Sequence, residues 1–179
     1  MGPGFSAHGS RAVACLWSGG SRRRKTVRCR RTVASEDMDA VRLVGLRDRS
    51  LSVAECLDAV RAPAAGGQAV FVGTVRDTDG GRPVVRLDYE AHPSAAARLG
   101  EVAQRVATRE PGCRLAALHR TGELAVGEVA VIVAVSSPHR GEAFSLCRRA
   151  VDDIKREVPI WKRQVFADGT AEWVGCACE

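Results

Sequence analysis

The chain has 179 residues, 45% of them hydrophobic, with a formal net charge of +6 and seven cysteines. This length predicts one domain with a sizeable core, and no apolar run approaches the roughly 18 residues of a membrane span, so no membrane partner is expected. The cysteines are scattered and none forms Cys-x-x-Cys, which disfavours a disulfide framework and predicts a reducing cytoplasm. Cys176 and Cys178 supply only two thiols, too few for a structural zinc site, so no metal is expected.

The positive charge is confined to residues 1–37, which hold eight basic and two acidic side chains (8 − 2 = +6). Residues 38–179 carry 19 basic and 19 acidic side chains and are neutral, so no nucleic-acid partner is expected. Three interpretations fit the tail: a nucleic-acid-binding arm, an organelle transit peptide, or an extension upstream of a start at Met38. We favour the last of these, and expect a disordered, dispensable extension at 1–37 and one domain at 38–179.

In chain order, hydrophobic patterning and turn residues predict seven strands and three helices after Met38. The first half contains a strand at 41–46, a helix from a Ser52–Glu55 capping box to about Val60, a buried strand at 68–76, and a strand at 84–91 that forms a hairpin with it. The second half contains a helix from His92-Pro93 to about Arg109, strands at 114–120 and 128–136, a helix at 141–157, and a strand pair at 160–166 and 170–175. Hairpins without strict alternation predict an α+β fold.

The helix at 141–157 carries an apolar stripe formed by Phe144, Cys147, Val151 and Ile154, which recur at helical spacing. Pro159 ends the helix, because it pushes the preceding residue out of the α region. Lys155 then lies in the last turn on the flank of the stripe. There its stem can pack while its amine faces a cleft.

Lysine is scarce: the chain has 24 arginines and only Lys25, Lys155 and Lys162. Arginine stays protonated, whereas a buried or crowded lysine amine can lose its proton and act as a base or nucleophile. Lys155 and Lys162 flank Pro159 and come from a helix end and a strand, an arrangement that can aim both amines at one place. The alternative is that two surface cations fall close together.

Further cations accompany this pair. Arg76 ends a predicted buried strand, next to a glycine-bearing loop. His139 and Arg140 begin the helix that carries Lys155, where free backbone N–H groups and the helix dipole favour an anion. These cations outnumber the nearby carboxylates, which predicts a pocket for a small phosphorylated ligand. The alternative is surface pairing of the arginines with Asp77, Asp79 or Glu142.

The remaining histidines and tryptophans after Met38 are expected to be structural. His119 alternates within a predicted strand, and His92 stands beside a proline. Trp161 and Trp173 are interpreted as packing residues.

Five collinear segments carry a resemblance that covers the chain from about residue 41 to 175. They are Phe-Val-Gly-Thr-Val-Arg76, Leu-Asp-Tyr-Glu90-Ala-His, His119-Arg-Thr-Gly-Glu-Leu, Val-Ser-Ser-Pro-His139-Arg140-Gly-Glu-Ala-Phe and Asp-Ile-Lys155-Arg-Glu-Val-Pro-Ile-Trp-Lys162-Arg. Each alone is weak and the set is specific. Together they resemble the large, catalytic subunit of molybdopterin synthase. The resemblance implies an α/β hammerhead-like fold with an additional antiparallel sheet.

The resemblance also implies a sulfurtransferase that takes part in molybdenum cofactor biosynthesis. Its partner would be a small ubiquitin-like sulfur-carrier subunit with a C-terminal Gly-Gly thiocarboxylate, one at each end of a central homodimer, which makes a heterotetramer. Its substrate would be cyclic pyranopterin monophosphate, which receives two sulfurs and becomes the molybdopterin dithiolene. No cofactor and no metal are implied for this subunit. The alternative from another class is a non-catalytic module that binds a small phosphorylated ligand.

By motif position, the resemblance implies that Lys155 and Lys162 are the catalytic lysines. It implies a larger set of substrate-binding residues: Thr74, Val75, Arg76, His139, Arg140, Lys155, Lys162, Arg163 and Gln164. His139 and Arg140 would reach in from the neighbouring protomer. Geometry favours this, because about 15 helical residues separate Arg140 from Lys155 by roughly 22 Å.

Overall fold

The computed structural model describes residues 40–174, which form an α+β fold as predicted. Its elements, in chain order, are β1 (Val41–Arg47), α1 (Val53–Ala59), β2 (Gly67–Thr74), β3 (Thr78–Asp79), β4 (Arg82–Ala91), α2 (Ala95–Ala107), β5 (Arg114–Arg120), β6 (Gly122–Ala125), β7 (Val129–Ser137), α3 (Arg140–Glu157), β8 (Ile160–Phe166) and β9 (Ala171–Val174). None of these helices is long and apolar enough to cross a membrane. The extension at 1–37 and the Cys176/Cys178 pair lie outside the described residues.

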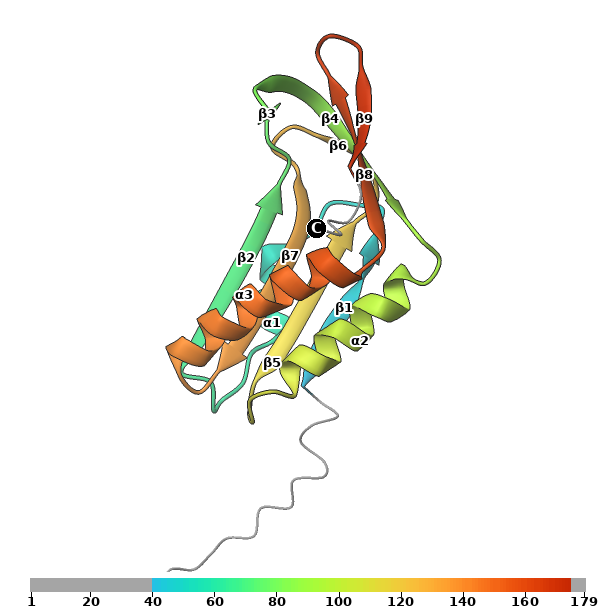
Figure 1. Cartoon of the computed structure of the whole chain (residues 1–179). Helices are drawn as coiled ribbons and strands as arrows, with labels where there is room; N and C mark the ends of the chain where they lie inside the picture. The colour runs from blue at the N-terminus through green and yellow to red at the C-terminus, as the bar shows by residue number, and fades with distance from the viewer. Residues whose placement is uncertain (1–39, 175–179) are drawn as a thin grey trace, which may run out of the picture. The chain divides into compact units, whose positions relative to one another are not determined.

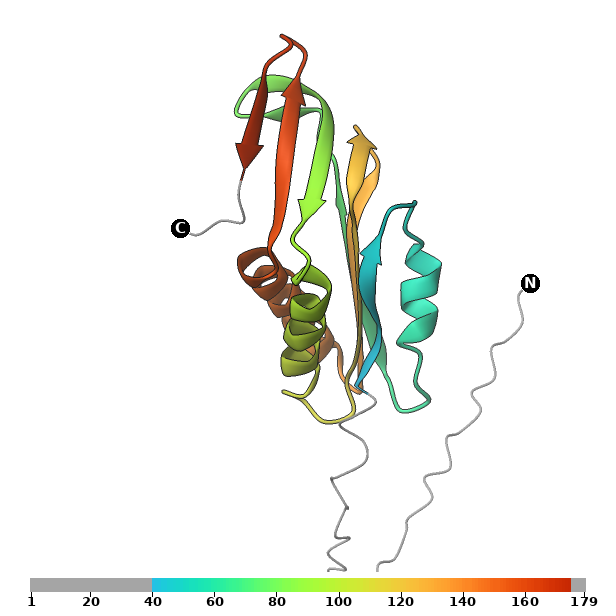
Figure 2. The same ribbon diagram turned by 90° about the vertical axis from the view of Figure 1, so that its right-hand side faces the viewer.

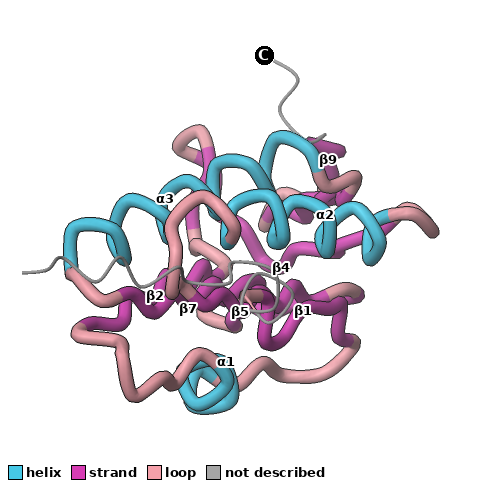
Figure 3. The backbone as a smooth tube through the Cα atoms, turned by 90° about the horizontal axis from the view of Figure 1, so that it is seen from below, coloured by secondary structure: helices cyan, strands magenta, loops and turns pink. Residues whose placement is uncertain are grey.

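The first sheet has four strands in the order β1-β5-β7-β2, with β1 parallel to β5 and the other neighbours antiparallel. Helices α2 and α3 lie along one face of this sheet and α1 lies against the other (Figure 1 and Figure 2). Figure 3 shows the resulting three layers end-on. Strand β7 is an inner strand of this sheet, between β5 and β2. Covered on both faces, β5 and β7 have the nearly continuous apolar sequences of buried strands.

Apolar side chains fill both faces of this sheet. The core under α2 and α3 contains the apolar face of α2, made of Leu99, Val102, Ala103 and Val106. On the other face, Cys56 of α1 packs in a smaller cluster with Leu118 of β5. The Ser52 side chain caps α1 by accepting a hydrogen bond from the Glu55 backbone N–H at 3.2 Å. This contact confirms the predicted start of the helix.

The second sheet is antiparallel, with β3, β4, β8 and β9 in that order and β6 paired to β4. It is the additional sheet that the resemblance implies. Strands β8 and β9 form the predicted hairpin, and its turn contains Gly169 with a φ of +84°. In the β4–β8 ladder, Tyr89 is paired with Lys162 and Leu87 with Gln164. Because side chains alternate along a strand, Lys162 and Gln164 share one face of β8.

The predicted hairpin between the strands at 68–76 and 84–91 is wrong. Strand β2 pairs with β7 in the first sheet, whereas β4 pairs with β3, β6 and β8 in the second. The turn that leads into β4 contains Gly80 and Gly81, whose φ values of +57° and +78° suit a two-residue type I′ hairpin from β3. Between the sheets, Val75 packs with Val84 and Leu87 in a third apolar cluster. Strand β2 thus ends in the first sheet at Thr74, and the hairpin that leads into β4 is formed by β3 in the second sheet.

The prediction that the strand at 68–76 is buried is also wrong for β2. It is the edge strand of the first sheet, and the side chains of Val70 and Val72 are 41% and 37% exposed. Their neighbours Ala69 and Phe71 point to the opposite face and pack in the core under α3. Helix α1 lies mainly beneath the middle strands of the sheet, so Val70 and Val72 on this edge stay partly exposed (Figure 3).

Helix α3 has the predicted extent, but Phe144 does not belong to its buried stripe and is 67% exposed. The buried face consists of Ala143, Leu146, Cys147, Ala150, Val151, Asp153 and Ile154. Phe144 lies about 100° around the helix from Ala143, just beyond the edge of this arc. Lys155 likewise lies about 100° around the helix from the buried Ile154, so it flanks the buried face as predicted.

Candidate active site

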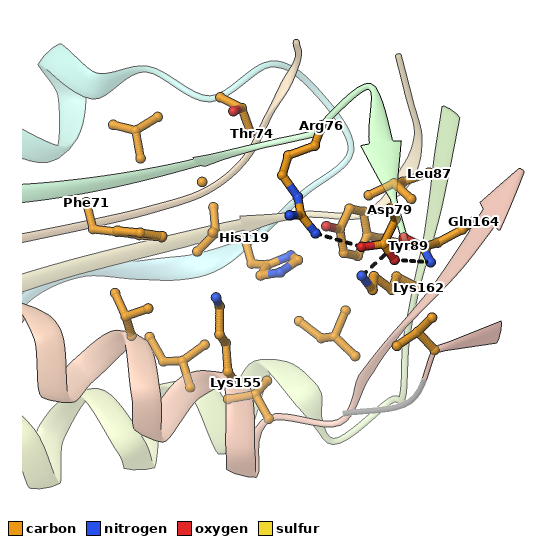
Figure 4. Close-up of a pocket in the computed structure, with 18 of the residues that line it drawn as sticks. Phe71, Thr74, Arg76, Asp79, Leu87, Tyr89, His119, Lys155, Lys162 and Gln164 are labelled. Atoms are coloured by element: carbon orange, nitrogen blue, oxygen red, sulfur yellow. Dashed lines mark hydrogen bonds and ion pairs between the residues drawn. The ribbon is translucent and has the colours of Figure 1, made fainter. Parts of the chain in front are cut away.

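A cavity of about 630 Å³ lies where the C-terminal half of α3 faces β2 and the second sheet. Residues from β2, the β3–β4 region, β5, α3 and β8 line it, so segments distant in the chain meet there (Figure 4). Five of the residues predicted for the site are among them: Thr74, Arg76, Lys155, Lys162 and Gln164. The cavity therefore brings both predicted catalytic lysines to one place.

Lys155 enters the cavity from the last turn of α3. The adjacent Ile154 is buried against the sheet, and the Lys155 Nζ lies 5.7 Å from the ring centroid of Phe71 on β2. An aromatic face attracts a cation without neutralising its charge. No carboxylate of residues 40–174 forms an ion pair with Lys155. Its positive charge is therefore available to an anionic ligand.

On the second-sheet side of the cavity, four polar side chains form one hydrogen-bonded network (Figure 4). Lys162 Nζ donates to Gln164 Oε1 at 3.3 Å, and Gln164 Nε2 donates to Asp79 Oδ2 at 2.6 Å. Asp79 Oδ1 accepts from Arg76 Nη2 at 2.7 Å. Gln164 is only 4% exposed, and its amide oxygen and nitrogen bond to Lys162 and Asp79 rather than to solvent. Gln164 thus orients Lys162 from below the cavity surface.

The pair between Arg76 and Asp79 is one that the surface-pairing alternative anticipated, but it lines the cavity. The hydrogen bond from Gln164 and the charges of Lys162 and Arg76 hold the pKa of Asp79 below its ordinary value. The carboxylate is therefore ionised at neutral pH. The lining thus combines the cations Arg76, Lys155 and Lys162 with one ionised carboxylate, that of Asp79.

His119, interpreted from the sequence as structural, also lines the cavity. Its Nδ1 lies 2.7 Å from the Arg120 carbonyl oxygen, which can only accept, so Nδ1 carries the proton and Nε2 is an acceptor. Burial lowers the pKa of His119, which keeps the imidazole neutral. Its ring meets the Tyr89 ring edge-on, with centroids 5.1 Å apart. No pattern in the β5 sequence marks His119 as a cavity residue, because the cavity wall exists only in the folded chain.

Two predicted substrate-binding residues, Val75 and Arg163, do not line the cavity. Val75 is 2% exposed within an apolar cluster, and its backbone N–H and carbonyl already bond to Glu128 and Gly127. Arg163 falls between Lys162 and Gln164 on β8 and points to the opposite face, where it forms a 3.6 Å ion pair with Asp88. Their predicted contacts with a ligand in this cavity have no support in the geometry of one chain.

His139 and Arg140 lie at the other end of α3 from Lys155. His139 is the N-cap and Arg140 the first residue of the helix, so about 15 residues at 1.5 Å each separate Arg140 from Lys155 by roughly 22 Å. Both side chains are exposed, and neither has a hydrogen bond or ion pair within the described residues. One chain does not bring these two residues to the cavity.

Comparison with known proteins assigns the family. Residues 46–157, from the end of β1 to the end of α3, match the MoaE protein family. The chain belongs to the MoaE family. Molybdopterin synthase catalytic subunit 1 of Mycobacterium tuberculosis is 47% identical over 131 residues, which cover 73% of this chain and 88% of that protein. The MoaE match includes Arg76 and Lys155, whereas Lys162 and Gln164 follow it on β8.

Solved structures share this fold. Molybdopterin synthase from Staphylococcus aureus superposes with a TM-score of 0.70 and 31% identity, covering 74% of this chain and 96% of that one. A complex of subunits 1 and 2 of molybdopterin-converting factor from Helicobacter pylori has a TM-score of 0.56 and 20% identity, covering 76% and 89% of the two chains. Within residues 40–174 of this MoaE-family chain, no group of three His, Cys, Asp or Glu side chains is placed to hold a metal ion.

Proposed function

We propose that this chain is the catalytic subunit of a molybdopterin synthase, a sulfurtransferase of molybdenum cofactor biosynthesis. It transfers sulfur from the thiocarboxylated Gly-Gly end of a small ubiquitin-like carrier subunit to cyclic pyranopterin monophosphate, which becomes the dithiolene of molybdopterin. The observation that carries the proposal is that Lys155 and Lys162, two of only three lysines, meet at one cavity of a MoaE-family chain.

The charges of the cavity suit both reactants. A thiocarboxylate and a cyclic phosphate are anions, and three cationic side chains, Arg76, Lys155 and Lys162, line the cavity. A Gly-Gly end has no side chains and can enter a narrow site in an extended conformation. The partner is further supported by relatives that are named as a subunit and by the two-subunit complex from H. pylori.

The net reaction makes one carbon–sulfur bond on the pterin for each carbon–oxygen bond broken. At one carbon the oxygen leaves as water, and at the other it stays on the phosphate, whose ring opens to a monoester. Each of the two carrier thiocarboxylates takes one oxygen from water and becomes a carboxylate, so one water is consumed overall. These steps require proton transfers, which a positioned amine accelerates by about 10²–10⁴-fold. We assign the transfer beside the thiocarboxylate to Lys155, which has no carboxylate partner within residues 40–174, and the second role to Lys162, which Gln164 holds in place.

We further propose that the working form contains a homodimer that completes each site. His139 and Arg140 lie about 22 Å from the Lys155 of their own chain, so they can serve only the cavity of a second copy. In a two-fold dimer the start of one α3 can approach the end of the other. Thr74, Arg76, Lys155 and Lys162 then come from one protomer, and His139 and Arg140 from its mate. With a carrier at each end, the assembly is a heterotetramer.

Reconstitution tests the reaction. The purified chain, a thiocarboxylated carrier and cyclic pyranopterin monophosphate are mixed, and the pterin is followed by mass spectrometry. We expect the substrate to exchange oxygen for two sulfur atoms, and no product when the carrier ends in an ordinary carboxylate. A chain that binds the substrate and yields no sulfur-containing product would support the rival function, a non-catalytic module for a small phosphorylated ligand. The names of its relatives do not favour that rival.

We place this activity in the cytoplasm, on the basis of the thiols. Cys56, Cys113 and Cys147 are free and buried. Unpaired thiols of this kind persist in reducing compartments, whereas secreted proteins usually pair them.

We predict that no cysteine of the chain takes part in sulfur transfer. Burial raises the pKa of the Cys56 thiol to about 11 and also raises the pKa values of Cys113 and Cys147, so little of the reactive thiolate forms. Replacing all seven cysteines, with alanine at these three sites, should leave the rate with a preformed thiocarboxylate unchanged. A variant that is folded and dimeric but inactive would contradict this.

We predict that residues 1–37 are dispensable. They hold the whole net charge of +6 and none of the residues assigned to the site. A chain that starts at Met38 should fold, dimerise and transfer sulfur as the full-length chain does, as measured by thermal unfolding, light scattering and the reconstituted assay. Loss of any of these in the shorter chain would show that the extension contributes to the working protein.

A further inference from the structure

Asp79 is a carboxylate in a cavity that, by the proposed function, receives two anions. Its side chain is only 30% exposed and lines the cavity wall, so Asp79 is part of the site and not a solvent-exposed charge. Each of its oxygens accepts one short hydrogen bond, from Arg76 at 2.7 Å and from Gln164 at 2.6 Å. In the absence of a ligand, the anion beside Arg76 and Lys162 is therefore the Asp79 carboxylate of the chain itself.

The direction of this network is determined by chemistry. A carboxylate only accepts hydrogen bonds and an ammonium group only donates them, so the Gln164 amide must point its nitrogen at Asp79 and its oxygen at Lys162. Asp79 thus accepts hydrogen bonds from the Arg76 guanidinium and from the Gln164 amide. The same amide accepts a hydrogen bond from Lys162, so Gln164 links Asp79 to Lys162. A phosphate group takes the same donors, because arginine and amide N–H groups bind any compact oxyanion in this way.

Asp79 also lies directly before a turn that is not packed against the rest of the protein. It is the last residue of the two-residue strand β3, and the turn after it consists of Gly80 and Gly81. A Cβ atom built on either glycine would meet nothing within 4 Å, so the turn is not packed against the rest of the protein. Withdrawing Asp79 from the cavity therefore breaks its two hydrogen bonds without breaking a core contact at the turn.

We propose that Asp79 is an internal anion that occupies the phosphate position of the cavity until a phosphorylated ligand displaces it. This inference rests on the proposed function for the identity of the natural ligand, and its chemistry needs only a phosphate. Before binding, Asp79 holds Arg76 and, through Gln164, Lys162 in place. A pterin without a phosphate has no anionic group to exchange for this carboxylate, so Asp79 selects phosphorylated pterins over unphosphorylated ones.

The test measures the affinity of the full-length chain for inorganic phosphate by NMR titration. Asp79→Asn keeps the size of the side chain and removes its charge, so Arg76 becomes free for the ligand. We expect phosphate to bind about tenfold more tightly, a difference of about 1.4 kcal/mol.

Asp77→Asn is the matched control. It removes the same charge two residues away, where Asp77 is exposed, bonds to Thr78 and lies outside the cavity lining. Its phosphate affinity should equal that of the wild type.

The outcomes distinguish two roles for Asp79: an anion that competes with phosphate, and a residue that only stabilises the fold. Tighter phosphate binding by Asp79→Asn cannot arise from a damaged hairpin, which would only weaken binding. Asp79→Ser provides a second, smaller variant, and far-UV circular dichroism checks that both variants are folded. If both bind phosphate no better than the wild type, or if Asp77→Asn gains as much, the inference is wrong. The assay uses no carrier, so a chain that fails to transfer sulfur would overturn the proposed function and leave this result unaffected.

Discussion

Lys155→Arg is expected to slow sulfur transfer by about 10²-fold or more while the protein stays folded and dimeric, because a positioned proton-transferring group contributes roughly 10²–10⁴-fold. Arginine keeps the positive charge and can still attract a thiocarboxylate, but its guanidinium does not give up a proton. The substitution therefore separates amine chemistry from electrostatic attraction. The measurement is the single-turnover rate in the reconstituted assay with saturating thiocarboxylated carrier.

The matched control is Arg149→Lys on the same helix. Arg149 forms a 3.8 Å ion pair with Asp153 and does not line the cavity, so the exchange of the two cation types there should leave the rate unchanged. If Lys155→Arg transfers sulfur at the wild-type rate, the amine has no chemical role, and the non-catalytic phosphate-binding module becomes the better description of this cavity.

Mixing two inactive variants, Lys155→Ala and Arg140→Ala, is expected to restore activity. In the proposed dimer each site takes Lys155 from one protomer and Arg140 from its mate. A mixed dimer then holds one site with both defects and one with neither, so it should reach about half the activity of a wild-type dimer. The measurement combines subunit exchange, checked by native mass spectrometry, with the sulfur-transfer rate of the mixture.

A second mixture provides the control for this experiment. Lys155 and Lys162 line the same cavity of one chain, so mixing Lys155→Ala with Lys162→Ala leaves one defect in every site and should restore nothing. If exchange is confirmed and neither mixture recovers activity, the shared-site model is wrong, and Arg140 belongs to a different step. Recovery in both mixtures would contradict the assignment of the two lysines to one site.

The residues of the candidate site could be predicted where a local signal marks them. Lys155 and Lys162 stand out because the chain uses arginine almost everywhere else, and they do line one cavity. Asp79 and His119 carry no such signal. Asp79 is one of several acids in a polar loop, and its part in the site depends on Gln164, which lies 85 residues further along the chain.

Likewise, the helices and strands that depend on local patterns could be predicted from the sequence. The turn residues and apolar periods predict β5, β8 and α3 within one residue of their observed ends, because period, caps and proline act over a few neighbouring residues. The pairing of the strands could not be predicted in this way. An apolar strand such as β2 fits a hairpin with β4 as well as an edge position beside β7, and the choice depends on contacts between residues far apart in the chain.

The same reason explains the site. The sequence could place Lys155 on a helix end and Lys162 on a strand, but the cavity that both line forms only in the folded chain, where β8 pairs with β4 and faces the end of α3. It also explains the exposed Phe144, since the arc of α3 that is buried depends on where the sheet lies beneath it. Local chemistry thus specified the reactive groups, and the packing of the two sheets against α3 decided which of them meet.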